Sequence, residues 1–556
     1  MRIKYFNIKL VLFLALLIYS HLYPAAYISL NDPVYEQLEV LRSYGLIDAE
    51  IVGTKPYTRQ EVALLISDAL YNGQRRLIPQ GAEVYNIVND LMSLYREEVL
   101  WYAGGQKIKR YIGLKSPEVL RFSYDYYNAQ RNRYSSDNAR ADITPMNAYN
   151  EGRLFSEGHN FNIENENRLQ LLNFIDVVFD NRFEFIIPTA DGDDDNFRWS
   201  VLKLYMVFEI IKDLQIEVGR NALVWGQGKR GQLLFSGNTE NLGEFDHIPF
   251  IRITNARPTV LKPLGAFKYQ LFFTTLAEAR QGFPHSKLFG ARIDFKPARH
   301  FEFGLSQAIL LGGQGSQANF WDGLGGFWGF ASDDPNYAEG NTSGTLNRYL
   351  EMDFSLRIPQ LNYSEVFAEF MLDDFSELGS SFDNYFNVHT GLHVPRITTN
   401  GGVGSELEYT HTSKTSYQSM TYSDGFTRNN RFFGNNLGPN AHELYSSIIL
   451  RPSYKNRHTL FFNFTKRSVS QYTEIPDIDV LLLNNKSLYP DELGFAGGWQ
   501  WQFVLTKNAI FKFHFGYERL INFANVVDDD RNQFFTGVFL ELYNPEFRIR
   551  AEEYTN

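Results

Sequence analysis

A strict alternation of apolar and polar residues is the feature that most constrains what this chain can fold into. In one run, five apolar residues alternate with four polar ones: Leu350, Met352, Phe354, Leu356 and Ile358 with Glu351, Asp353, Ser355 and Arg357. Alternate residues of a strand face opposite sides of a sheet, so one side of this strand is apolar and the other is charged. The same period recurs from about residue 112 to the end of the chain. An apolar outer face with a polar inner face is typical of transmembrane β-barrels.

The beginning of the chain is typical of an exported protein. Three basic residues precede an apolar run from Leu10 to Tyr19, and Pro24-Ala25-Ala26 supplies the small residues of a cleavage site. This pattern predicts a secretory signal peptide over residues 1–26, with cleavage after Ala26. The apolar run is shorter than the roughly 20 residues of a membrane-spanning helix. No later run approaches that length. A location in a membrane therefore requires a closed barrel, which pairs every backbone polar group.

Composition excludes several classes of protein. The 556 residues contain no cysteine, which excludes a disulfide framework, a thiolate metal site and a lipoprotein anchor. Aromatic residues make up 16% of the chain, with 47 Phe and 33 Tyr, and barrels place such residues on the lipid face and in two girdles. The formal charge of −11 argues against a nucleic-acid partner. The alternative that composition leaves open is a large soluble secreted β-protein.

Residues 27–110 have a different, helical periodicity. Asn31-Asp32-Pro33 predicts a helix start and Gly45 its end. Thr58 and Glu61 form a capping box for a second helix, and a third is predicted from near Gly81. We therefore expect a small helical bundle in the periplasm, which braces or occludes the barrel. Residues 111–556 then form a large antiparallel barrel of 16–18 strands, with 18 favoured, at roughly 25 residues per strand and connection.

Several motifs invite a chemical interpretation that their context does not support. Residues 226–231 spell G-x-G-x-x-G, but no helix is predicted after them to hold a pyrophosphate. A tight glycine turn that lets Trp225 pack closely is the better interpretation. The acidic runs 191–195 and 528–530 lack the spacing of an EF-hand and are interpreted as solvated loops. His389 and His393 lie four apart in a strand-like stretch, which is not a helical ligand pair. We expect no metal, no cofactor and no enzymatic activity.

The polar, glycine-rich interval 312–347 is the candidate ligand site. It carries aromatic and acidic residues that suit a sugar, because aromatic faces contact C–H groups and carboxylates bind hydroxyls: Phe320, Trp321, Asp322, Trp328, Asp333, Asp334 and Tyr337. The alternative is a loop that folds into the lumen and packs its aromatics against the wall. Both interpretations stay open at this point.

One segment resembles a known family. Val218-Gly219-Arg220, Trp225-Gly226-Gln227-Gly228 and Ser236-Gly237-Asn238 resemble the capsule assembly Wzi family, whose members carry a W-G-x-G element followed by a Ser-x-Asn step. Lys55 to Val62 is similar to the helical module that precedes such barrels. The motif residues are Trp225, Gly226, Gly228, Ser236 and Asn238. The sequence departs from the family where Gln227 replaces a common proline, which leaves the ligand open.

The resemblance implies a function and a location. It implies a lectin-like barrel in the outer membrane of a diderm bacterium, with 18 strands, a plugged lumen and a periplasmic helical bundle. It also implies that this barrel holds capsular or extracellular polysaccharide at the cell surface. Expected partners besides the polysaccharide are outer-membrane lipid, lipopolysaccharide and the barrel assembly machinery. The alternatives are a porin or polysaccharide-export channel and an outer-membrane hydrolase. The mixed charges of Glu351, Asp353 and Arg357 fit a plugged interior better than a channel of one charge sign.

Overall fold

The computed structural model describes most of the chain from Ala26 to Thr555. The ranges left out are 76–83, 105–106, 129–131, 137–138, 145, 147–150, 154–155, 172–174, 189–196, 212, 246, 262–264, 277–279, 281–282, 315–345, 374–385, 399, 420–421, 470–487 and 544–547. The predicted signal peptide therefore lies almost entirely outside the described residues, which include only its last residue, Ala26.

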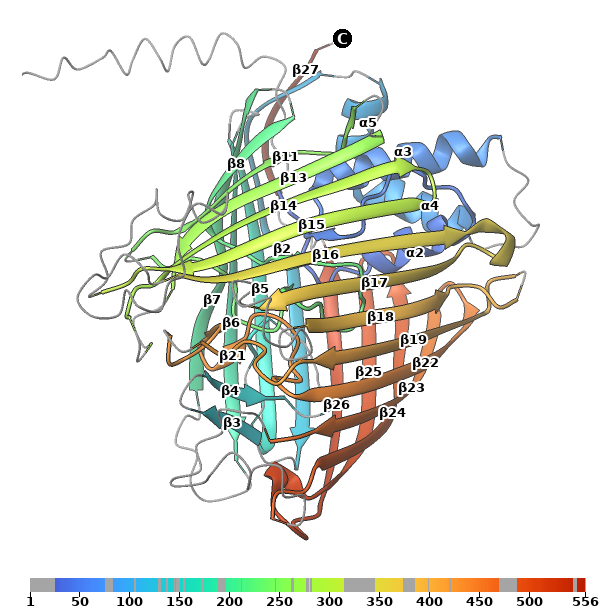
Figure 1. Cartoon of the computed structure of the whole chain (residues 1–556). Coiled ribbons are helices and arrows are strands. Elements are labelled where there is room, and N and C mark those ends of the chain that lie inside the picture. Colours follow the sequence, from blue (N-terminus) through green and yellow to red (C-terminus); the bar gives the residue numbers. More distant parts are fainter. Residues whose placement is uncertain are drawn as a thin grey trace, which may run out of the picture.

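Most of the described strands form one closed antiparallel barrel (Figure 1). Its segments, in chain order, are β2 (Lys107–Tyr127), β5 (Gly158–Leu171), β6 (Ile175–Ile187), β7 (Phe197–Ile211), β8 (Leu214–Arg220), β11 (Phe250–Asn255), β12 (Thr259–Leu261), β13 (Gly265–Thr275), β14 (Lys287–Ala298), β15 (Phe301–Leu311), β16 (Leu346–Ile358), β17 (Ser364–Asp373), β18 (Phe386–Val394), β19 (Val403–Thr412), β22 (Ala441–Ser453), β23 (Asn456–Arg467), β24 (Glu492–Thr506), β25 (Ala509–Ile521), β26 (Arg531–Tyr543) and β27 (Arg548–Thr555). β2 closes the ring, because it pairs with β5 on one edge and with β26 and β27 on the other. β12 continues β11 along β13, and β27 continues β26 along β2. The described segments thus make 18 strands around the barrel, which confirms the favoured count.

Side chains in the strands follow the predicted alternation. On β16, Met352 and Leu356 are 48% and 45% exposed on the outer surface. Glu351 and Asp353, on the two sides of Met352 in the sequence, are fully buried. Because an exposed apolar outer face suits lipid while charged groups require polar partners, the charged side of the strand faces the lumen.

The two ends of the barrel differ in their connections. At one end, which we call the short-turn end, neighbouring strands are joined by a few residues, such as 359–363 between β16 and β17, where the 3-10 helix η5 (Pro359–Leu361) lies. At the other, the long-loop end, β15 and β16 are joined through residues 312–345 and β19 and β22 through residues 413–440. The connection of β25 to β26 at that end includes the 3-10 helix η8 (Phe523–Asn525). The helices gather at the short-turn end (Figure 1).

The described part of the N-terminal region contains four α-helices where three are predicted. They are α2 (Val34–Ser43), α3 (Arg59–Gly73), α4 (Val84–Leu94) and α5 (Arg96–Gly104). α2 starts one residue after Pro33, and Asp32 Oδ1 accepts a hydrogen bond from the Val34 N–H at 2.8 Å. Gly45 has the left-handed φ of 68° that ends this helix. Among the described residues, no helix combines the length and apolar character needed to cross a bilayer.

A shared apolar core holds the helices together. Its members are buried side chains from the turns and from all four helices: Ile28, Val34, Leu38, Leu41, Leu46, Ile47, Tyr57, Val62, Ala63, Leu65, Ile66, Ala69, Val84, Ile87, Val88, Leu91, Tyr95 and Val99. Thr58 caps α3, because its Oγ1 accepts a hydrogen bond from the Glu61 N–H at 3.0 Å. The apolar faces predicted from the helical periodicity are therefore the faces that pack.

Three segments enter the lumen, and we call them together the plug. They are residues 50–58 before α3, residues 221–244 between β8 and β11, and residues 413–440 between β19 and β22. β1 (Thr54–Lys55) pairs with β9 (Val224–Trp225), which also pairs with β10 (Phe235–Ser236). The third segment forms the small hairpin β20 (Thr427–Arg428) and β21 (Arg431–Phe432). A further hairpin, β3 (Asn132–Ser136) and β4 (Ala139–Ile143), meets that segment where the Asp142 N–H donates to the Asn430 carbonyl at 2.7 Å.

Candidate functional site

Barrel-wall carboxylates bind the backbone of the plug. Glu369 on β17 accepts hydrogen bonds from the N–H groups of Gly228 (2.7 Å) and Leu233 (3.2 Å). Glu408 on β19 accepts from the N–H groups of Lys229 (3.2 Å) and Arg230 (3.1 Å). Both carboxylates are buried. Because charge-assisted hydrogen bonds of this kind are stronger than neutral ones, two side chains fix one plug segment to the wall at four points.

The glycines of the G-x-G element are required by this close approach. Gly226 has a φ of 125°, a conformation that other residues rarely adopt. A Cβ atom at Gly228 would overlap the imidazole ring of His389. His389 is held in turn by Glu408, 3.0 Å from its Nε2, and by Glu369, 3.4 Å from its Nδ1. The predicted tight glycine turn is therefore confirmed, and no helix follows it before the short strand β10 (Phe235–Ser236).

Several charged groups of the wall are paired within the lumen. Gln227 Nε2 donates to Asp353 Oδ1 at 2.7 Å and to Glu302 Oε1 at 3.0 Å. Arg292 on β14 forms ion pairs with Asp353 at 2.7 Å and with Asp294 at 2.6 Å. Glu302 also accepts hydrogen bonds from the N–H groups of residues 52 and 53 in the first plug segment. At these residues the inner face carries paired charges of both signs, whereas the buried Glu351 carboxylate beside them has no hydrogen-bond partner among the described residues.

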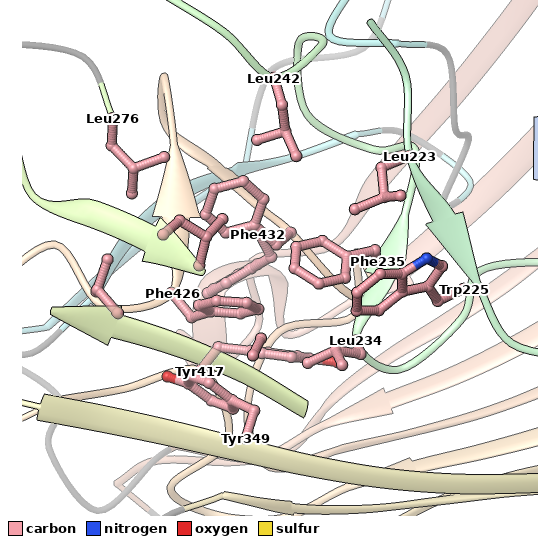
Figure 2. Packing of buried hydrophobic residues seen from close by; sticks show 14 of the residues in the cluster. Leu223, Trp225, Leu234, Phe235, Leu242, Leu276, Tyr349, Tyr417, Phe426 and Phe432 are labelled. Carbon is pink, nitrogen blue, oxygen red and sulfur yellow. The ribbon is translucent and has the colours of Figure 1, made fainter. Parts of the chain in front are cut away.

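An aromatic core fills the space between the plug segments (Figure 2). Trp225 is fully buried, donates from Nε1 to Gln270 Oε1 at 2.9 Å and packs against Phe235 and Phe272. From the third segment, Phe426 and Phe433 contact Phe235. An apolar cluster of this kind inside a polar lumen excludes water and stabilises the plug as a folded unit.

The remaining motif residues join two plug segments. Ser236 Oγ donates to the carbonyl of Phe433 at 3.2 Å, and Asn238 Nδ2 donates to the carbonyl of Phe432 at 3.1 Å. Both side chains are buried. The structure therefore brings Trp225, Gly226, Gly228, Ser236 and Asn238 together in the plug, where they pack and pair and do not face solvent.

The helical bundle is fixed to the wall by buried ion pairs that sequence reasoning missed. Glu61 on α3 does not serve only its capping box, because its carboxylate pairs with Lys268 Nζ on β13 at 2.7 Å. Glu98 on α5 pairs with Arg59 on α3 at 2.6 Å and with Arg168 on the wall strand β5 at 3.7 Å. Burial alone would raise the pKa of the Glu98 carboxyl, but the guanidinium groups of Arg59 and Arg168 lower that pKa to about 2. The Glu98 contact therefore stays ionised throughout the physiological pH range.

The predicted glycan residues lie outside the described part of the chain. Phe320, Trp321, Asp322, Trp328, Asp333, Asp334 and Tyr337 all fall within 315–345. The stem of this loop is described, and it lies against the plug. The Gly312 carbonyl accepts a hydrogen bond from Tyr422 Oη at 3.2 Å, and Tyr349 stacks on Phe426 at 4.1 Å between ring centroids. The loop therefore leaves the wall beside the third plug segment, at the long-loop end.

The candidate metal positions give no metal site among the described residues, in which no group of three or more His, Asp and Glu side chains could hold an ion. His389 and His393 lie on the strand β18 and both contact Glu408. In the acidic run 528–530, Asp529 pairs with Arg531 at 2.9 Å and Asp530 with Arg519 at 3.3 Å. The run 191–195 lies outside the described residues.

Comparison with known proteins places the chain in a family. The family model of the capsule assembly protein Wzi matches residues 128–533, a range that includes most barrel strands and two plug segments. The chain belongs to the capsule assembly Wzi family. It is accordingly an outer-membrane β-barrel, as the alternation predicts. No curated protein sequence matches the chain.

The solved structure of one member of the family agrees on the fold. The chain matches Wzi of Escherichia coli with a TM-score of 0.62 and 14% identity, over 93% of this chain and 99% of that one. That protein is described as an outer-membrane protein involved in group 1 capsule assembly and as a carbohydrate-binding β-barrel. OprD of Pseudomonas aeruginosa matches with a TM-score of 0.40 and 9% identity over 80% of this chain and 96% of that one. OccAB1 of Acinetobacter baumannii matches with a TM-score of 0.41 and 10% identity over 79% and 97%. The last two likenesses are too weak to inform function.

Proposed function

We propose that this protein binds capsular or extracellular polysaccharide at the cell surface and holds it there, without catalysis and without transport through its lumen. The supporting observation is the plug. Wall carboxylates bind its backbone, and an apolar cluster fills its centre. A filled lumen leaves the long-loop end as a closed platform for a polymer. The carbohydrate-binding description of the Escherichia coli protein supports the same ligand class.

The orientation follows from the unequal connections. Short turns of outer-membrane barrels face the periplasm and long loops face the outside. The helical bundle at the short-turn end would then lie on the periplasmic side, after export directed by the signal peptide 1–26 and insertion by the barrel assembly machinery. Outer-membrane lipid and lipopolysaccharide would surround the apolar strand faces. The aromatic loop 315–345 would be presented to the polysaccharide.

Replacing Trp321 and Trp328 together with Ala is expected to weaken retention of polysaccharide about thirtyfold, because each stacking contact contributes about 1 kcal/mol. Retention is measured on cells that display equal amounts of folded protein. Trp199→Ala is the matched control, because Trp199 is an exposed tryptophan on β7. Equal retention by the double variant and the control would show that this loop is not the binding site.

The protein is expected to show no steady large conductance in a planar bilayer, because the plug fills its lumen. A porin of comparable diameter serves as the positive control. A steady conductance that depends on ion charge would instead favour the porin or export-channel alternative.

Incubation of the purified protein with glycan should likewise leave the chain length of the glycan unchanged, whereas shortening would favour a hydrolase.

A further inference from the structure

A cavity of about 270 Å³ lies at the short-turn end, between the helical bundle and the wall. On the bundle side it is lined from α2 and α4. On the wall side it is lined from the turns that join β18 to β19, β22 to β23 and β24 to β25, and from the strands β2, β5 and β6. The lining also includes six carboxylates: Asp32, Glu36, Glu39, Asp90, Glu118 and Glu166. The cavity is therefore at the opposite end of the barrel from the proposed polysaccharide platform, and nothing in the proposed function uses it.

Cationic side chains enter this cavity from the turns. Arg457 donates a hydrogen bond to Glu36 on α2. Arg396 lies over the ring of Tyr44, 4.0 Å from its centroid, and its Nε donates to the Ser43 carbonyl at 3.0 Å. Lys507, from the β24–β25 turn, lines the same cavity. The first two groups thus have partners on the bundle.

Arg451 differs from its neighbours, because no carboxylate among the described residues lies within 4.0 Å of its guanidinium. Its Nη1 donates only to the Pro395 carbonyl, at 3.2 Å. Its strongest charge–charge interaction is repulsion from Arg457. The carboxylates that attract it, Glu36, Glu39 and Glu406, are already bound: Glu36 to Arg457, and Glu39 and Glu406 to Lys229. Arg451 is therefore a partly buried cation without an ionic partner in the described structure.

A partly buried cation is unfavourable unless an anion compensates it. The planar guanidinium fork matches carboxylate and phosphate groups, which it can bind through two parallel hydrogen bonds. We propose that this cavity is an anion-binding site, in which Arg451 binds a carboxylate or phosphate group and Lys507 lines the same space. An acidic sugar residue and a phospholipid headgroup both carry this chemistry. The site does not depend on polysaccharide binding at the long-loop end.

The test measures binding of the soluble probes to the full chain in detergent, and binding of lipid vesicles to the full chain in detergent-free nanodiscs. The probes are trigalacturonate, the neutral trisaccharide maltotriose and inorganic phosphate, with vesicles of phosphatidylglycerol or phosphatidylcholine as the lipid pair. We expect an anionic probe to bind better than its neutral counterpart, and R451Q to lower that affinity about tenfold or more. R519Q is the matched control, because Arg519 lies exposed at the long-loop end, paired with Asp530. K507Q, in the β24–β25 turn, should lower the affinity less than R451Q does. It replaces R451Q as the test variant if R451Q does not fold.

Each pattern of results decides the proposal. Binding of trigalacturonate that is sensitive to R451Q assigns the site to an acidic sugar, and the same sensitivity for phosphatidylglycerol vesicles alone assigns it to a lipid headgroup. Sensitivity for phosphate alone assigns a site for a free phosphate group. Two results would overturn the proposal. One is equal affinity for the charged and the neutral probes, and the other is a loss of affinity for the anionic probe that is the same in R451Q and R519Q. The Trp321 and Trp328 double variant should keep the R451-dependent binding, which separates this site from the polysaccharide platform.

Discussion

Replacing Lys268 with Met is expected to lower the free energy of unfolding by about 3–5 kcal/mol, because it leaves a buried carboxylate without its partner. Lys268 Nζ lies 2.7 and 3.0 Å from the two carboxylate oxygens of Glu61. The side chains are 1% and 0% exposed, so water cannot replace the lost ammonium group. Because Glu61 is in the first turn of α3, the bundle should loosen from the wall. The thermal unfolding midpoint in detergent and limited proteolysis of α3 measure the two effects.

Two control variants separate this pair from an ordinary charge change. Glu61→Gln combined with Lys268→Met removes both charges and should recover most of the lost stability. Lys466→Met breaks the pair with Asp491 at 3.1 Å, but Lys466 is 41% exposed. Such an exposed pair contributes about 0–1 kcal/mol. If Lys268→Met costs no more than Lys466→Met, the buried pair does not hold the bundle.

The Glu61 contact shows where sequence reasoning stops. The capping box predicts the start of α3, because Thr58 and Glu61 are three residues apart and interact locally. The period of two likewise predicts that Lys268 faces the lumen between Phe267 and Tyr269. Neither pattern predicts that these two side chains meet, since 207 residues separate them and only barrel closure brings them together.

The plug shows the same limit. The alternation places the charged residues of β17 and β19 on the lumen side, and the glycines predict a tight turn at 226–228. That Glu369 and Glu408 bind the backbone of this turn could not be predicted, because backbone N–H groups leave no signal in a sequence. The polysaccharide site remains a prediction, since the residues proposed for it lie outside the described part of the chain.

Replacing Gly228 with Ala is expected to displace residues 226–233 from the wall and to lower the free energy of unfolding by about 1–3 kcal/mol. The added methyl group would overlap His389. That ring cannot move aside freely, because Glu369 and Glu408 hold it and the same carboxylates bind the N–H groups of the turn. Movement of either the His389 ring or the turn therefore breaks several charge-assisted hydrogen bonds together. The unfolding midpoint and the conductance of single molecules in a planar bilayer measure the result.

The matched control for this substitution is Gly497→Ala on β24. A Cβ atom there lies 3.4 Å from its nearest neighbour, the Phe461 carbonyl oxygen, and meets no side chain. Stability should change by less than about 0.5 kcal/mol, and the lumen should stay closed. If the lumen is closed by the contacts of this turn, Gly228→Ala alone should produce brief openings. Stability and conductance equal to those of Gly497→Ala would mean that the plug tolerates movement at the turn, and that the aromatic core around Trp225 alone keeps the lumen closed.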